Sequence, residues 1–239
     1  MKVVLLRVGI DTGSGGIHGP IFDDSTFEFV PIPDYSGIDS RKYGNTKDKS
    51  HGRMLADYFP LARRNDMANQ SIHFDPEFDS FTYGDPTSPK ARLRALMKGD
   101  LLVFYSGLEG WNSPRAPALY IIGYLEVATA GRARELGEET VRGQYSLNFH
   151  VRHPNVLKKD WNDLVLVRGS QKGSRLLETA IRISTTSHDR DGKPLKILSP
   201  EMREVFGDFG GKLSIQRSPP RWVNERFIHS AAEFVRSLN

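Results

Sequence analysis

Apolar residues in this chain form short runs separated by longer polar stretches, as in a protein that builds a sheet with intervening helices and loops. Six runs predict β-strands, at residues 3–6, 27–33, 101–105, 119–127, 164–168 and 181–183. The run at 27–33 alternates apolar and polar positions and ends on prolines, so we expect an edge strand there. The runs at 101–105 and 119–127 are almost continuously apolar, which is typical of buried strands.

Six further segments predict helices or single helical turns. They lie at residues 52–59, 90–98, 132–142, 174–180, 200–206 and 224–238. The segment at 90–98 is basic and places Leu93, Leu96 and Met97 on one face. Residues 34–70 and 106–118 are predicted to be mainly loop. Short helices among strands indicate an α+β fold with a curved, mostly antiparallel sheet, and we expect one domain over residues 1–239.

Composition excludes several classes of site. The chain has no cysteine, which removes disulfides, thiolate nucleophiles and cysteine-bound metals. No apolar run approaches the roughly 20 residues of a membrane helix, and the N-terminus is typical of a first strand, so we expect a cytoplasmic protein with no membrane partner. The net charge of +4 permits nucleic-acid binding without demonstrating it.

The opening loop is the most informative segment. A predicted strand delivers Arg7 and Asp11 into a glycine-rich stretch, residues 13–16, that is followed by His18. Exposed amides and Arg7 suit a phosphate group, and Asp11 or His18 is a candidate catalytic acid or base. The loop lacks the lysine and spacing of a P-loop and the glycine pattern of a dinucleotide fold. The alternative is a flexible turn in which His18 caps a strand.

An acidic and aromatic segment follows in the middle of the chain. Asp75, Glu77, Asp79 and Asp85, together with Asp11, could bind Mg²⁺ through oxygen ligands. We favour the alternative, in which the aspartates before prolines form turns and the aromatic residues belong to the core.

Two histidines three residues apart, His150 and His153, could contribute to a zinc site, but the sequence nominates no third ligand. The sequence therefore predicts no metal site and no cofactor.

Three aromatic residues are candidates to stack on a base: Tyr83, Tyr105 and Trp111. Tyr105 and Ser106 end a predicted buried strand, where the mouth of a pocket would expose them. In the alternative, Tyr105 belongs to the core and Ser106 to a turn.

The best candidate for a backbone-binding loop lies between the predicted strand at 164–168 and the predicted helix at 174–180. It carries four polar or cationic candidates, Arg168, Lys172, Ser174 and Arg175. Guanidinium groups and amides at a helix start both suit phosphate oxygens. Arg217, Arg221 and Trp222 add cationic and stacking groups near the C-terminus. The alternative is a solvated loop.

Residues 92–106 and 119–127 resemble the PUA-like superfamily, in particular its EVE and ASCH branches. The shared pattern is a helix, Gly99-Asp100, an apolar strand with an aromatic end, and a second strand that contains Gly123. The resemblance implies a partly closed β-barrel that holds an RNA base or a modified DNA base in an aromatic pocket.

A longer resemblance extends over nearly the whole chain. Residues 13–22, 75–78, 81–85, 104–108, 169–175 and 216–222 are similar to the third family of nucleotide modification associated domains. This resemblance implies a role in DNA base modification, and it favours nucleic-acid contact by the loop at 168–175.

Two functions from different classes remain open. The first is recognition or processing of a modified base, with nucleic acid as the partner and DNA favoured over RNA. The second is an enzyme of nucleotide or base modification, a transferase or a hydrolase, that uses Asp11 and His18. A scaffold for modification enzymes is a third alternative. A pure reader has no need of the opening loop, whereas no complete catalytic signature is present.

Overall fold

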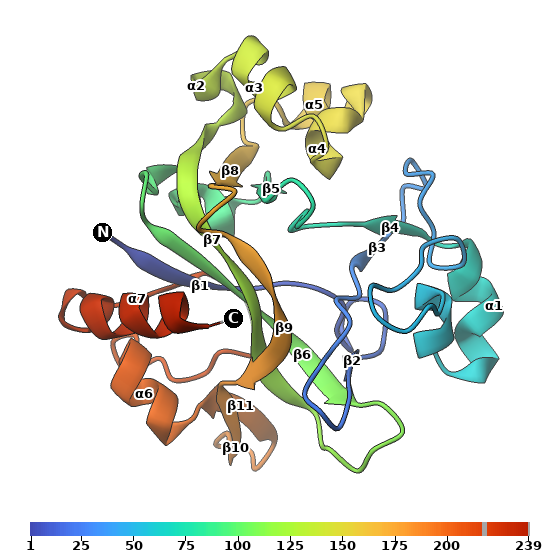
Figure 1. Cartoon of the computed structure of the whole chain (residues 1–239), viewed down its shortest axis with the longest axis vertical. Helices are drawn as coiled ribbons and strands as arrows, with labels where there is room; N and C mark the ends of the chain where they lie inside the picture. The colour runs from blue at the N-terminus through green and yellow to red at the C-terminus, as the bar shows by residue number, and fades with distance from the viewer. Residues whose placement is uncertain (217–218, 239) are drawn as a thin grey trace.

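The computed structural model describes residues 1–216 and 219–238. Within them a mixed sheet of eight strands forms the centre of the molecule (Figure 1). Its main path runs β12-β1-β6-β7-β8-β5, while β2 pairs with β6 and β9 pairs with β7. The strands are β1 (Val3–Arg7), β2 (Gly19–Ile21), β5 (Thr82–Asp85), β6 (Leu101–Gly110), β7 (Ala118–Arg132), β8 (Val165–Gly169), β9 (Arg175–Arg182) and β12 (Arg221–Trp222).

The sheet is mixed because β1 and β2 both run parallel to β6, while its other pairings are antiparallel. The path of paired strands ends at β12 and β5, and within the described residues no pairing between these two closes it. The fold is thus mixed α and β with an open sheet, and the expected partly closed barrel is not confirmed. The main core contains residues of β1, β6 and β7 that are fully buried, such as Leu5, Phe104 and Ile121.

A lobe with its own small core packs beside this sheet, at the right of Figure 1. It contains β3 (Ile32–Asp34) paired with β4 (Ser71–His73), the 3₁₀ helix η1 (Leu55–Tyr58) and α1 (Leu61–Asn69). Tyr43 and Phe59 lie at its centre, edge to face with ring centroids 5.0 Å apart.

Two further groups of elements complete the chain. Between β7 and β8 lie α2 (Ala133–Leu136), α3 (Glu138–Gln144), α4 (Phe149–Arg152) and α5 (Pro154–Asp160), which enclose a third core around Tyr145. The other elements are η2 (Ser88–Ala95), β10 (Ser184–His188), β11 (Pro194–Leu198), α6 (Pro200–Phe206), η3 (Glu225–Phe227) and α7 (Ile228–Ser237). Helix α7 buries Ala231 and Val235 against the main core because its apolar residues share one face.

Most predicted elements are present, and three segments differ from the prediction. The segment at 174–180 is not helical: it belongs to β9, whose burial comes from its pairing with β7. Among residues 27–31 the structure has one isolated bridge, from Phe27 to Ile21, and the strand near them is β3. The basic segment at 90–98 is largely the 3₁₀ helix η2, in which Leu93 is buried while Met97 is 62% exposed.

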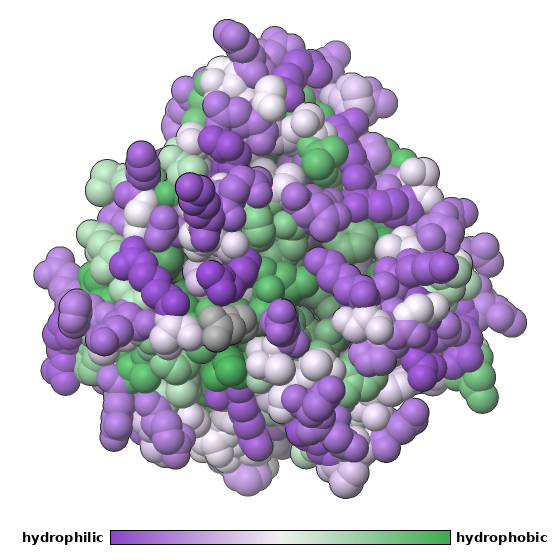
Figure 2. Space-filling view, in the orientation of Figure 1, coloured by the Kyte–Doolittle hydropathy of each residue, from purple (hydrophilic) through white to green (hydrophobic). Residues whose placement is uncertain are grey.

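Hydrophilic residues cover most of the face seen in Figure 2, and apolar residues are visible mainly toward its middle. None of the helices in the described part of the chain is long and apolar enough to cross a membrane.

We predict opposite effects of alanine at two glycines. A Cβ at Gly123 would lie 2.6 Å from the carbonyl oxygen of Arg175 and 2.8 Å from the Phe78 ring, so Gly123→Ala should cost about 1–3 kcal/mol of unfolding free energy. Gly143 in α3 is exposed and has open space around it, so Gly143→Ala should stabilise by about 0.5–1 kcal/mol. Urea unfolding measures both, and equal stability of the two variants would contradict the close approach at Gly123.

Candidate functional site

The opening loop is held by the carboxylate of Asp11. One oxygen, Oδ1, accepts the amides of Gly13 and Ser14 at 2.8 Å and 2.7 Å, and the other lies 3.1 Å from the Arg7 guanidinium. The following Gly15 and Gly16 have φ values of +96° and +79°, which residues that carry a side chain rarely adopt. The glycines thus allow the turn, and Asp11 fixes it.

His18 joins Arg7 and Asp11 at one cleft. Its Nδ1 lies 3.3 Å from a Glu109 oxygen, and its ring approaches Gly107 next to the Arg7 guanidinium. The cleft encloses about 440 Å³ and is also lined by Lys196. The structure therefore brings together the three residues that the sequence nominated, beside an additional cation that it did not.

The Arg7–Asp11 ion pair also borders a second cavity. This cavity encloses about 300 Å³ and is also lined by Asp75, Asp85 and Lys90. Arg7 and Asp11 thus stand between the two cavities. Arginine and lysine can bind an anionic group there, while a histidine at the rim can transfer a proton.

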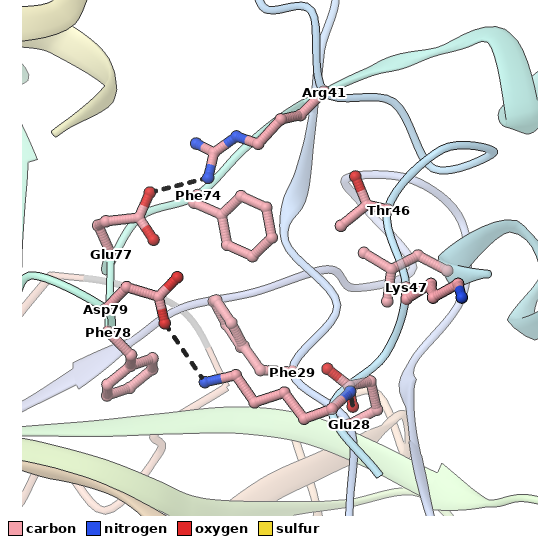
Figure 3. Close-up of a pocket in the computed structure, with 11 residues that line it drawn as sticks. Glu28, Phe29, Arg41, Thr46, Lys47, Phe74, Glu77, Phe78 and Asp79 are labelled. Atoms are coloured by element: carbon pink, nitrogen blue, oxygen red, sulfur yellow. Dashed lines mark hydrogen bonds and ion pairs between the residues drawn. The ribbon is translucent and has the colours of Figure 1, made fainter. Parts of the chain in front are cut away.

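A third cavity of about 390 Å³ lies between the central sheet and the lobe, and its volume is within the usual range of small-molecule sites (Figure 3). Phe29, Phe74 and Phe78 supply its aromatic surface, with Phe29 edge to face on Phe78 at 5.6 Å. The Arg41 guanidinium lies 4.3 Å from the centroid of the Phe74 ring. We call this cavity the aromatic pocket.

Two buried carboxyl groups line the aromatic pocket. Glu28 is 4% exposed, and its side chain accepts the backbone amide of Lys49 at 2.9 Å. Glu77 is 3% exposed and accepts a hydrogen bond from Arg41 at 3.0 Å. Burial raises the pKa of Glu28 to about 7, although the Lys49 amide acts against the shift.

Burial also raises the pKa of Glu77, while the charge of Arg41 acts against that shift. At neutral pH the Glu28 carboxyl group is therefore present in both protonation states. Such a group both donates and accepts hydrogen bonds and can exchange a proton with a ligand.

Three of the residues nominated for stacking or for a pocket mouth are buried instead. Tyr105 is 0% exposed and donates a hydrogen bond to the carbonyl of Ile215 at 2.9 Å. Tyr83 is 3% exposed and donates to Asp85 at 3.1 Å. Ser106, also 3% exposed, lies within β6, which extends beyond the predicted strand end. The Tyr105 ring is thus enclosed by the core, whereas Tyr83, although buried, borders the cavity that Arg7 and Asp11 also line.

Trp111 lines a shallow cavity of about 570 Å³ together with His18. Its ring packs edge to face on Tyr58 with centroids 5.0 Å apart, and it is half-buried. Trp111 therefore retains more accessible surface than Tyr83 and Tyr105.

The basic loop at 168–175 connects β8 to β9, which both pair with β7, and it does not precede a helix. Ser174 is buried, and its hydroxyl accepts the amide of Glu126 at 3.1 Å, so it attaches the loop to β7. Arg168 belongs to β8 and Lys172 to the turn, whereas the Arg175 guanidinium lies 6.0 Å from the Tyr124 ring centroid. The amides of a helix start are thus not available here, and the cationic side chains remain.

The C-terminal candidates have mainly structural contacts. Arg221 donates to the carbonyl of Ser214 at 2.6 Å, and the Arg92 guanidinium lies 4.3 Å from the Trp222 ring centroid. Both Arg221 and Trp222 belong to β12 at the edge of the sheet. Arg217 lies outside the described residues.

The comparisons with known proteins agree with the longer resemblance. The family described as nucleotide modification associated domain 3 matches residues 2–237. The chain belongs to this family. No curated protein and no solved structure matches the chain. The family description associates this domain with nucleotide modification, and the matched residues include the lining of all four cavities described above.

The aromatic pocket was not predicted as a site. Phe74, Phe78 and Glu77 stand in the acidic and aromatic segment that the sequence drew attention to, but their partners Glu28 and Arg41 are distant along the chain. Glu28 occupies a polar position in an alternating run, which predicts a solvent-facing side chain. Its burial could not be read from that pattern because residues 27–31 do not form a regular strand.

We predict that Glu28 makes folding stability dependent on pH. Its pKa is about 7 in the folded state and 4.5 as the ordinary value, so the folded protein retains the proton between these values. The contribution of Glu28 to the unfolding free energy is fully present below about pH 4.5. As the pH rises to about 7, the unfolding free energy falls by about 3 kcal/mol. Glu28→Gln lacks the ionisable group, so its stability relative to wild type should be higher at pH 8 than at pH 5. Urea unfolding at both pH values measures the difference.

The exposed Glu178 provides the control for this measurement. Glu178→Gln should keep the pH dependence of the wild type. An unchanged pH dependence in Glu28→Gln would show that Glu28 titrates normally and is not poised near neutrality.

Proposed function

We propose that the protein binds a nucleobase in the aromatic pocket, as part of a nucleotide or of a base turned out of a nucleic-acid strand. The observation that carries the proposal is the lining of this pocket. It combines aromatic rings with an arginine plane and two buried carboxyl groups in about 390 Å³. Proteins that hold extruded bases use this combination of stacking surfaces and hydrogen-bonding groups.

Each group has a definite task in this proposal. Phe74 and the Arg41 guanidinium offer flat surfaces on which a base stacks. Glu28 and Glu77 offer acceptors for the amino or imino groups on the edge of a base, as carboxylates do for cytosine N4. Glu28 in its protonated form also donates a hydrogen bond to a base nitrogen or carbonyl.

The basic loop at 168–175 supports binding to a strand rather than to a free nucleotide alone. At Gly123 the Phe78 ring and the backbone of Arg175 come together, so this loop ends beside the pocket. Lys47 and Lys49 line the pocket itself. In this arrangement Arg168 and Lys172 contact phosphates of the strand whose base enters the pocket. The membership in the nucleotide modification family is consistent with such a ligand.

We predict that Phe74→Ala weakens binding of nucleotides by about 5- to 150-fold, because stacking of one base contributes about 1–3 kcal/mol. The measurement is fluorescence anisotropy with labelled DNA and RNA, plain and base-modified, and calorimetry with mononucleotides.

Lys172→Ala should weaken oligonucleotide binding and leave mononucleotide binding unchanged in the same measurements. It should also reduce the slope of log affinity against log salt concentration by about 1.

The matched control is Arg190→Ala in the connection between β10 and β11, an exposed basic residue in another loop. It should bind as the wild type does. The proposal fails if Phe74→Ala binds nucleotides with the affinity of the wild type. It also fails if the wild type binds them no more tightly than an unrelated protein of similar positive charge does. Absence of all nucleic-acid and nucleotide binding would favour a scaffold.

A second candidate function is catalysis at the Arg7, Asp11 and His18 cleft, favoured by the convergence of these three residues on one cavity. Arg7 and Lys196 would bind a phosphate, and His18 would act as the proton-transfer group. The chemistry is group transfer to or from a nucleotide, or hydrolysis of it.

We predict that His18→Gln and Asp11→Asn abolish turnover of a nucleotide substrate without lowering the melting temperature. Asparagine at position 11 keeps the acceptor for the two loop amides, whereas Asp11→Ala removes it and should destabilise by about 1 kcal/mol. Product analysis of the binding mixtures, with melting curves of the three variants, is the measurement. Turnover that survives both conservative substitutions would leave the loop with a structural role.

A further inference from the structure

Two histidines and a carboxylate meet behind the aromatic pocket. His73 ends β4, Asp75 follows two residues later, and His150 lies in α4. Within the described residues, one ligand atom from each lies within 4.8 Å of those of the other two, and no other group of three acidic, histidine or cysteine residues meets this criterion. The sequence suggested neither this pairing of His150 with His73 nor its third member.

The hydrogen bonds of these residues leave side-chain atoms available as metal ligands. His73 Nε2 is buried and has no hydrogen-bond partner in the described part of the protein. Asp75 uses Oδ1 to accept the amide of Gly84 at 2.9 Å, which leaves Oδ2 outside that bond. The Cδ2 edge of His150 also lies beside Gly84, at 3.2 Å from the position that a Cβ would take there.

The other nitrogen of His150 is already oriented. Its Nδ1 lies 3.3 Å from Oδ2 of Asp160, the last residue of α5. Histidines that bind metals usually donate their second N–H to a carboxylate, which fixes the ring and exposes Nε2 as the ligand. The His73 ring is also fixed, since it stacks on Phe149 with centroids 3.8 Å apart.

The nearby Lys90 is paired with Asp85 at 3.5 Å. A bound cation would supply the partner that the buried Nε2 of His73 lacks within the described part of the protein.

We propose that His73, Asp75 and His150 bind one divalent transition-metal ion, with Asp160 as the outer carboxylate that orients His150. Two imidazoles and one carboxylate suit zinc and its neighbours better than magnesium or calcium, which prefer oxygen ligands alone. Bonds of about 2.0–2.1 Å in a tetrahedral zinc site place two ligand atoms about 3.4 Å apart, so ligand atoms separated by up to 4.8 Å must move closer together when the ion binds. Three protein ligands leave a position for water or for a ligand.

The site has an entry path. Asp75 lines the cavity of about 300 Å³ that Arg7 and Asp11 also line. The ion therefore lies at the edge of the space that leads to the opening loop. A water molecule or a phosphate oxygen bound to the ion would face the cation of Arg7 across this cavity.

His153 provides a matched control because it is a neighbouring histidine with a different environment. Its Nε2 lies 3.6 Å from an Asp39 oxygen, and Asp39 is also paired with Arg41 and Arg152. His153 thus belongs to an ion-pair network beside the proposed site and is not one of its ligands.

The experiment uses the whole chain without a histidine tag, stripped with EDTA and titrated with ZnCl₂ and CoCl₂. We expect one equivalent to bind in calorimetry, visible absorption bands of nitrogen-bound Co²⁺, and a rise in melting temperature with Zn²⁺. Asp75→Asn and His150→Gln should lose the site, Asp160→Asn should weaken it by about 10- to 100-fold, and His153→Gln should bind as the wild type does.

Three results would overturn the proposal. They are the absence of a stoichiometric Zn²⁺ or Co²⁺ complex in the wild type, a loss in His153→Gln equal to that in His150→Gln, and preferential binding of Mg²⁺ or Ca²⁺. If a ligand variant does not fold, the Co²⁺ spectrum of the wild type and the affinity of Asp160→Asn decide the question.

Discussion

The antiparallel pairing of β6 with β7 is the constraint on which the rest of the structure depends. β1 and β2 attach to β6, while β8 and β9 attach to β7. β7 is long enough to pair with β6 along its first part and with β8 along its second. Within the pairing of β7 with β8 the register shifts between Val127 and Thr129, close to the point where the pairing with β6 ends. The helices α2 to α5 and the lobe around α1 are connected to this frame by the loops that leave it (Figure 1).

The short segment at residues 73–77, at the end of β4 and just after it, contributes residues to the aromatic pocket, to the cavity beside Arg7 and Asp11, and to the proposed metal site. Phe74 and Glu77 line the aromatic pocket, whereas Asp75 lines the cavity beside Arg7 and Asp11. His73 faces α4 and stacks on Phe149. The segment lies between the central sheet and both peripheral groups of elements, so its neighbouring residues face different cavities. A change in its path would therefore alter the proposed base-binding pocket and the proposed metal site together.

The two proposed functions assign different chemistry to two places in the molecule. Together they would provide one place for a base and another for a phosphate or a reacting group. The aromatic pocket has the aromatic and carboxyl groups for the first, and the Arg7 cleft has the cations and the histidine for the second. The predicted stacking role of Tyr105 does not fit this division, because that ring fills the core between β6 and Ile215.

Local sequence patterns were enough to predict the elements whose burial is continuous or strictly periodic. The apolar runs in β1, β6, β7 and β8 predicted strands, and the amphipathic pattern predicted α7. These predictions succeed because the spacing of apolar residues along the chain follows directly from which face of a strand or helix is buried. The glycine-rich loop with Arg7, Asp11 and His18 was also identifiable, since its residues are close along the chain. The strand β9 was predicted as helix because its burial comes from pairing with β7, a contact that its own sequence does not contain.

The tertiary structure alone decided which polar residues are buried and which meet. Glu28 and Arg41 join the phenylalanines of the aromatic pocket, and His150 joins His73 and Asp75, across separations that no spacing rule covers. The physical reason is that a pKa shift, a stacking surface or a metal site depends on the groups that surround a side chain in space. The sequence determined the strands, the helix faces and the opening loop, whereas the packing of the lobe and of α4 against the sheet determined the pockets.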